Sequence, residues 1–200
     1  MTDTPKTITV DGTTLTVALE RKRVKNINAR LRGTTLAVSA PMNVAQAELD
    51  QVITELARRL LRRVQTRQVN AEEDALVVVQ RVAARFANRP VVAQVLFSTN
   101  QRARWGSYSA TTRTIRLNAV LRHMPPWVLE SVVAHELAHV THMDHSPAFW
   151  ALVRSVDQHV ERADAFLAGV SWLGSRWETL PPVERAVLTH APDYNHEGDT

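Results

Sequence analysis

The segment HELAHVTHMDH, residues 135–145, places four histidines, a glutamate and an aspartate directly after an apolar stretch. Apolar side chains recur at helical spacing from Pro126 onwards, which predicts one helix from Pro126 to about Thr141. Positions i and i+4 of a helix lie on one face, so His135 and His139 point the same way. Burying polar side chains without partners is costly, so the fold must supply a partner for them. We expect this partner to be a metal ion.

The order H-E-x-x-H adds a base to the two imidazoles. Glu136 follows the first ligand immediately, so it projects beside the metal and can take a proton from the water that the metal activates. Zinc lowers the pKa of such a water towards about 7 and polarises the carbonyl under attack. These residues predict one zinc ion per chain with Glu136 as general base. The alternative, in which the histidines are ordinary helix residues and Glu136 is solvated, stays open at this point.

His142 and His145 compete for the role of third ligand, which a catalytic zinc ion generally needs. His142 shares the ligand face, but its Cα lies about 10.5 Å along the helix axis from that of His135, which is far for one ion. Asp144 tolerates the left-handed conformation that can end a helix, so the chain can turn back at this point. We therefore expect His145 as third ligand, His142 as a neighbour of the site, and Asp144 as a hydrogen-bond partner that orients a ligand imidazole.

The first part of the chain is predicted to be β-structure. Side chains alternate between apolar and polar around Asp11 and Gly12, which predicts a hairpin, and two more short strands are expected around Gly33. From Val44 the apolar period becomes helical. The expected apolar stripe consists of Val52, Ile53, Leu56, Leu60 and Val64. Asn70 is expected to be the N-cap of a second helix over residues 71–88.

The second half is predicted to mix strands and helices. Residues 91–98 are rich in β-branched side chains, and residues 102–109 and 112–121 are expected to form a hairpin or two further strands. A helix is expected to begin at Ser146 and Pro147 and to continue through Phe166. We expect an N-terminal β section at 1–43, a helical pair and catalytic core at 44–170, and a tail at 171–200 that is partly disordered and frays after Ala191.

Composition limits the chemistry and the location. The chain has no cysteine, which excludes disulfides, thiolate zinc sites, iron–sulfur clusters and a cysteine nucleophile. No secretory signal pattern and no apolar run of membrane length is present, so we expect a cytoplasmic protein without membrane contact. The net charge is +4, and basic residues cluster at 21–32 and 58–67. A solvated helix face explains the second cluster better than a polyanion or nucleic-acid surface, because no aromatic residues interleave with the bases.

Three separated blocks, R-W-G-S at 104–107, I-R-L-N at 115–118 and HELAH to HSPAFW at 135–150, resemble the YgjP-like family of zinc-dependent metallopeptidases. Its catalytic region is related to the WLM and SprT-type domains, and the resemblance covers roughly residues 20–170. It implies an α+β fold with a zincin-like core, in which a small antiparallel or mixed sheet lies beside the helix that carries HExxH. It also implies zinc ligands and a general base at the positions named above, namely His135, His139, His145 and Glu136.

Two positions depart from the family. Cysteine is common there where Tyr108 stands, and asparagine where Asp144 stands. Neither position is a proposed ligand, and the first departure suggests that no cysteine chemistry is required.

The segment Trp105-Gly106-Ser107 is expected to border the cleft. An edge strand above the metal can hold an extended substrate by strand addition, and glycine permits close backbone approach. Tyr108 or Arg104 could stabilise an oxyanion. The alternative, that Trp105 and Trp150 are core aromatics, is slightly favoured.

Three functions remain open from the sequence. The first is a zinc-dependent metallopeptidase that acts on a peptide or protein. The second is a metal-dependent nucleoside-triphosphate pyrophosphatase, with the basic strands at 21–32 holding phosphates, although no Gly-rich phosphate loop supports it. The third is a non-catalytic zinc-containing adaptor that binds nucleic acid. Two or three imidazoles with an open coordination position suit zinc better than other metals.

Overall fold

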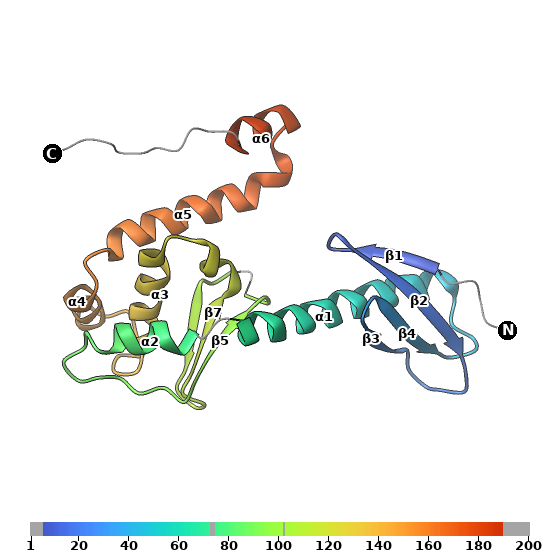
Figure 1. The fold of residues 1–200 in the computed structure, drawn as a ribbon, viewed down its shortest axis with the longest axis horizontal. Helices are drawn as coiled ribbons and strands as arrows, with labels where there is room; N and C mark the ends of the chain where they lie inside the picture. Colours follow the sequence, from blue (N-terminus) through green and yellow to red (C-terminus); the bar gives the residue numbers. More distant parts are fainter. Residues whose placement is uncertain (1–5, 73–74, 102, 190–200) are drawn as a thin grey trace.

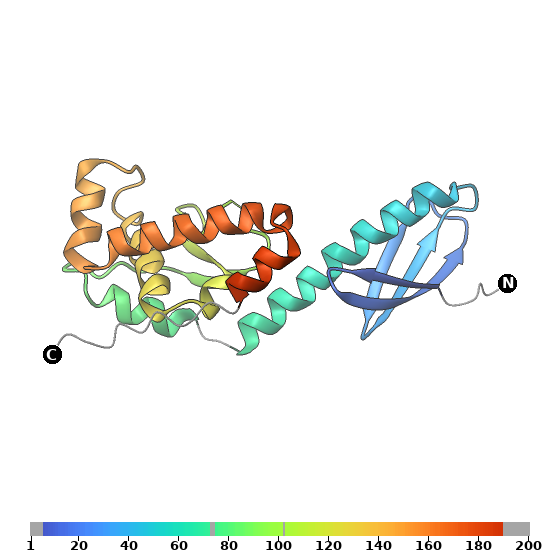
Figure 2. The same ribbon diagram turned by 90° about the horizontal axis from the view of Figure 1, so that it is seen from above.

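The computed structural model describes residues 6–72, 75–101 and 103–189. These residues form two small β-sheets linked by one long helix, with further helices around the second sheet (Figures 1 and 2). The α+β class expected from the sequence is confirmed at this level. The tail expected to fray after Ala191 lies outside the described residues. No helix within the described ranges combines the length and apolar character that crossing a bilayer requires.

The first sheet has the strand order β1-β2-β4-β3. Its strands are β1 (Lys6–Val10), β2 (Thr13–Arg21), β3 (Asn28–Arg32) and β4 (Thr35–Ala40). Asp11 and Gly12 both have positive φ, 47° and 78°, which is the geometry of a two-residue hairpin turn, and the predicted hairpin is confirmed. The two strands expected around Gly33 are β3 and β4, which pair antiparallel, while β4 also pairs parallel with β2.

Helix α1 (Gln46–Glu72) packs its first half against this sheet. Four of its residues, spaced by four, are buried there: Leu49, Ile53, Ala57 and Leu61. The expected apolar stripe was therefore partly wrong, since Val64 is 48% exposed. Two apolar rows run side by side along the helix, and spacing alone does not tell which row faces the sheet. Val52 and Leu56 line a groove instead, and Leu60 lines that groove while also packing against the core of the first sheet.

Asn70 is not an N-cap, because α1 continues through it to Glu72 and the next helix, α2 (Ala75–Ala83), begins beyond it. Its side chain bonds to a strand instead. The Phe97 N–H donates to Asn70 Oδ1 at 2.8 Å, and Asn70 Nδ2 donates to the Phe97 carbonyl at 2.9 Å. The amide thus continues the hydrogen-bond pattern of the open edge of β5 (Gln94–Ser98) and fixes the end of α1 to the second sheet.

The second sheet has the order β5-β7-β6, with β6 (Gly106–Ser109) and β7 (Thr114–Asn118). β6 and β7 form the expected hairpin, and β5 pairs parallel with β7, so the sheet is mixed. One face buries Phe97, Ile115 and Leu117 in the core cluster that contains the apolar residues of α2 and of α3 (Pro126–Ala138). The short helix η1 (Ala119–His123) connects β7 to α3.

The helix expected at 146–166 is broken into α4 (Pro147–Val156) and α5 (Val160–Arg176). Its predicted start is confirmed, since Ser146 accepts a hydrogen bond from the Phe149 N–H at 3.4 Å. The break occurs at Asp157, whose buried carboxylate accepts hydrogen bonds from Ser131 Oγ and from the His159 N–H. These partners satisfy the carboxylate only if the backbone leaves the helix there.

α5 extends beyond Phe166 to Arg176, across the boundary at 170–171 where the tail was expected to begin. The short helix η2 (Trp177–Thr179) and α6 (Pro182–Thr189) follow it.

Asn70→Ala should lower the free energy of unfolding by about 2 kcal/mol, because it leaves both the N–H and the carbonyl of Phe97 without their partner. Urea unfolding measures the change. Asn28→Ala is the control, since Asn28 lies exposed on β3 and its side chain donates to the nearby Asn26 carbonyl. A change within about 0.5 kcal/mol is expected for the control. Equal effects in the two variants would contradict the strand-capping role of Asn70.

Candidate metal centre

α3 ends at Ala138, three residues before the expected end at Thr141. The chain leaves the helix through tight turns, in which the Thr141 and His142 N–H groups both donate to the Ala138 carbonyl. Asp144 is not in a left-handed conformation, because Asp11 and Arg113 are the only non-glycine residues with positive φ among the described residues. The expected bend therefore exists but is made by turns immediately after the helix. These turns bring residues 142–146 back alongside its last turn.

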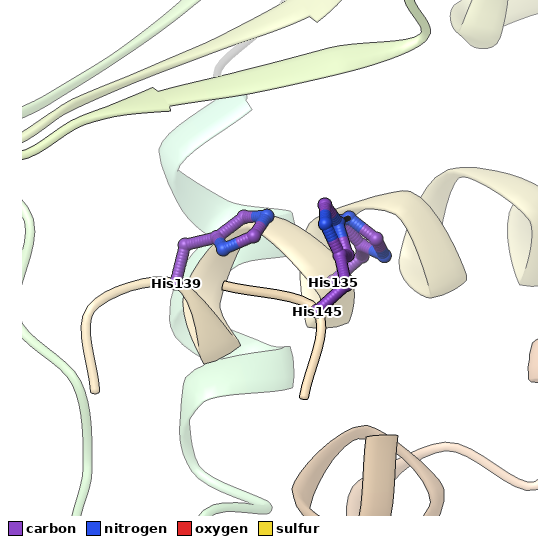
Figure 3. A group of neighbouring side chains, drawn as sticks. All are labelled: His135, His139 and His145. Carbon is purple, nitrogen blue, oxygen red and sulfur yellow. Dashed lines mark hydrogen bonds between the residues drawn. The ribbon is translucent and has the colours of Figure 1, made fainter. Parts of the chain in front are cut away.

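The structure brings His135, His139 and His145 together (Figure 3). One ring nitrogen from each lies within 4.8 Å of the other two, and the Nε2 atoms of His135 and His145 are 3.0 Å apart. A tetrahedral zinc ion with bonds of about 2.0–2.1 Å needs ligand atoms about 3.3–3.4 Å apart. The three nitrogens therefore fit one metal ion after small movements.

His142 acts on this cluster through its backbone. The His139 Nδ1–H donates to the His142 carbonyl at 3.0 Å, and since a carbonyl can only accept, the proton must sit on Nδ1. The Nε2 lone pair of His139 is then free to bind a metal. The side chain of His142 is half-buried, and it does not belong to the three-histidine group.

Phe149, on the first turn of α4, packs against all three imidazoles. Its ring centroid lies 4.6 Å from that of His139, in a stacked geometry, and 4.9 Å from those of His135 and His145. Phe149 is fully buried, so it limits ring rotation in the cluster. The sequence pattern gave no sign of this role, because periodicity indicates burial of Phe149 but not its contacts.

Burial and the neighbouring imidazoles lower the pKa of His135 to about 4. Burial also lowers the pKa of His139, against an opposing contribution from the His142 carbonyl. Both rings are therefore neutral at pH 7, and the neutral imidazole is the form that binds a metal.

Glu136 is only 5% exposed and lies against β6. Burial raises the pKa of its carboxyl group to about 7, and two features oppose this rise: a hydrogen bond from the Tyr108 backbone N–H and the charge of Arg104. Gly106 makes the close approach possible, since a Cβ atom there would lie 2.8 Å from Cγ of Glu136. The carboxylate is thus held between α3 and an edge strand, directly beside the histidines.

A cleft of about 380 Å³ opens over the histidines and Glu136. Four of the residues expected to border the site also line it: Arg104, Gly106, Ser107 and Tyr108. Trp105 does not. It packs against the core and lines a separate cavity of about 200 Å³ that also touches Glu136.

Two residues near the histidines differ from the sequence expectations. Asp144 is exposed, and hydrogen bonds with Ser146 lower its pKa, so its carboxylate is occupied there. A hydrogen bond donated by a ligand imidazole to the Asp144 carboxylate stays a prediction, although the charge of Asp144 does raise the pKa of His139. Met143 was not expected at the site but lines the cleft with an exposed side chain, and only its position between the histidines could have suggested this.

His145→Ala should lower the zinc content from about one ion per chain to near zero, because two imidazoles alone do not hold a zinc ion firmly. His142→Ala should keep the metal, since the variant retains the backbone carbonyl that bonds to His139. Elemental mass spectrometry after zinc loading and dialysis measures both. Loss of zinc only in His142→Ala would overturn the assignment of His145.

Gly106→Ala should lower the free energy of unfolding by about 1–3 kcal/mol, because the added methyl group meets the buried side chain of Glu136. The matched control is Gly169→Ala on α5, where a Cβ atom has open space and alanine favours the helix. Chemical unfolding of the two metal-free variants gives the comparison. If Gly169→Ala lowered the free energy of unfolding and Gly106→Ala left it unchanged, the contact of Gly106 with Glu136 would be loose.

Comparison with known proteins agrees with this arrangement. The family model described as YgjP-like, metallopeptidase domain matches residues 71–169, which contain α2, the second sheet, α3, α4 and the three histidines. No curated protein and no solved structure matches the chain. The matched family implies a metal, usually zinc, and a hydrolase. Residues 71–169 of the chain therefore form a metallopeptidase domain of the YgjP-like family.

Proposed function

We propose that this protein is a zinc-dependent metallopeptidase with Glu136 as its general base and His135, His139 and His145 as metal ligands. The observation that carries the proposal is the position of one buried carboxyl group beside three converging imidazoles, within the segment that matches a metallopeptidase family. When bound, a zinc ion would lower the pKa of water and polarise a carbonyl group.

The ligand set supports a catalytic site over a structural one. Structural zinc sites usually have four protein ligands, whereas catalytic sites have three and keep one position open. Within the part of the chain that the structure describes, the group contains three histidines and no fourth ligand. Asp144, one candidate for a fourth ligand, bonds with Ser146. This arrangement favours an enzyme over the non-catalytic adaptor.

Glu136 is suited to moving a proton in both directions. Its carboxylate must be ionised to accept a proton from the attacking water, and the Tyr108 N–H and Arg104 favour that ionised form. Burial favours the protonated form, which supports the return of the proton from the same group to the leaving amine. Below about pH 7 the carboxyl group is mostly protonated in the metal-free chain and cannot act as a base.

β6 is suited to hold a peptide in extended form. It is an edge strand of the second sheet, and three of its four residues, Gly106, Ser107 and Tyr108, line the cleft. A peptide added as a fourth strand would have its backbone paired with β6 and one carbonyl group near the metal. Arg104 or Tyr108, which both line this cleft, could donate to the oxyanion.

Phosphoanhydride hydrolysis has less support. The basic segment 21–32 that would hold phosphates belongs to the first sheet, which lies at the far end of α1 from the second sheet in both views (Figures 1 and 2). Arg21 is already engaged, since it donates to the Val44 carbonyl at 3.0 Å and to Gln46. Release of phosphate or pyrophosphate from a panel of nucleoside triphosphates would favour this alternative.

Glu136→Gln should lower kcat/KM for peptide hydrolysis by about 10²–10⁴-fold and keep the zinc content, because it removes the base but leaves the imidazoles untouched. A library of quenched fluorescent peptides provides the assay. Glu130→Gln is the matched control on the same helix, since Glu130 pairs with Arg81 and Arg85. Turnover retained by Glu136→Gln would remove Glu136 as the base.

A further inference from the structure

The side of α1 that does not face the first sheet carries a row of arginines. Arg59, Arg62, Arg63 and Arg67 line a groove of about 980 Å³. Arg58, on the same stretch, is paired with Asp11 and Glu55, whereas these four have no ion-pair partner among the described residues. Their guanidinium groups are therefore available to a ligand.

This groove continues to the metal cleft through shared residues. Asn100 lines the α1 groove and also a hollow of about 540 Å³ on the second sheet. Two residues of that hollow, Arg104 and Ser107, also line the cleft over the histidines. Arg116 in the hollow adds a further positive charge. We call the continuous surface formed by the α1 groove and this hollow the basic groove.

The two parts of the basic groove are held together by hydrogen bonds. Thr66 Oγ1 on α1 and Thr99 Oγ1 lie 2.7 Å apart, and Asn70 bonds to the backbone of β5. The arginines of α1 are thus fixed relative to the sheet that borders the metal cleft. A ligand could engage both at once without a change of fold.

The chemistry of the basic groove favours an acidic polypeptide. Guanidinium groups bind carboxylates strongly and often in bidentate fashion. The apolar side chains of Val52, Leu56 and Leu60 line the same groove, and they offer contact to aliphatic side chains. A nucleic acid would gain little from these aliphatic groups, and no aromatic side chain lines the basic groove to stack on bases.

We propose that the basic groove binds an acidic segment, with aliphatic residues interspersed, of the polypeptide that is cleaved at the metal centre. The proposal rests on the proposed peptidase function, because the basic groove leads into the cleft over Glu136. The substrate class is then a protein with an acidic stretch beside the cleaved bond. Opposite charge would favour encounter with such a protein as well as its binding.

The first test is binding to the zinc-loaded Glu136→Gln variant, which does not depend on turnover. Two fluorescent peptides of equal length are compared, one of alternating Glu and Leu and one of alternating Gln and Leu. We expect the acidic peptide to bind at least about tenfold more tightly, with an affinity that falls as salt is added. Equal affinities would overturn the proposal, as would tighter binding of an oligothymidylate of the same charge.

Arg59→Gln combined with Arg63→Gln, in the same background, should weaken binding of the acidic peptide about tenfold and leave the neutral peptide unchanged. The matched control is Arg30→Gln with Arg32→Gln, which removes the same charge from exposed positions of β3 outside the basic groove. An equal loss in the control pair would show that net charge alone attracts the peptide, and would overturn the proposal.

Hydrolysis by the wild-type enzyme separates this proposal from the proposed function. Substrates carry the acidic or the neutral extension on one side or the other of the same cleavable core. We expect the acidic extension on one side to raise kcat/KM about tenfold, and the raised rate to be lost in the Arg59→Gln, Arg63→Gln variant. Zinc-dependent cleavage at the same rate with either extension would support the peptidase function and would overturn the proposed role of the basic groove. Tight binding of the acidic peptide without any peptide cleavage would overturn the peptidase instead.

Discussion

The contact between α3 and β6 at Glu136 is the constraint on which the rest of the site depends. A carboxyl group is buried there against a backbone that approaches closely because Gly106 has no side chain. The approach also places the Tyr108 N–H on the carboxylate. Since His135 precedes Glu136 directly on α3, fixing Glu136 against the strand fixes His135 as well. The cleft is therefore positioned by one helix–strand contact, and the turns after α3 then add the third imidazole.

In the metal-free chain, this arrangement lowers the free energy of unfolding at any pH. The pKa of Glu136 is raised to about 7, so its contribution to stability is present below its ordinary pKa and is lost as the pH rises through 7. The pKa of His135 is lowered to about 4, so its contribution is present above its ordinary pKa and is lost as the pH falls towards 4. A bound cation would stabilise the ionised carboxylate of Glu136. It would also require the neutral form of the His135 imidazole. Metal binding and stability should therefore be coupled most strongly in neutral and alkaline solution.

The sequence predicted the parts of this site that depend on regular geometry. Helical spacing was enough to place His135 and His139 on one face, and the rise per residue separated His145 from His142 as the histidine that joins them. It did not predict the early end of α3 or the role of the His142 carbonyl, because backbone bonds in a turn leave no residue pattern. Asn70 was misassigned for a related reason: an amide that caps a helix and one that pairs with a strand edge look alike in sequence.

α1 explains why a peptidase domain at residues 71–169 is preceded by a separate sheet. The helix buries Leu49 to Leu61 against the first sheet, which has its own core, and its last residues bond to β5. An isolated helix with so many arginines on one side would be marginal in water, because like charges spaced by four repel and little apolar surface is buried. The first sheet supplies the burial that α1 needs. It thereby holds the arginines of α1 along the basic groove, and under our proposal the first sheet supports substrate selection without contributing a residue to the metal centre.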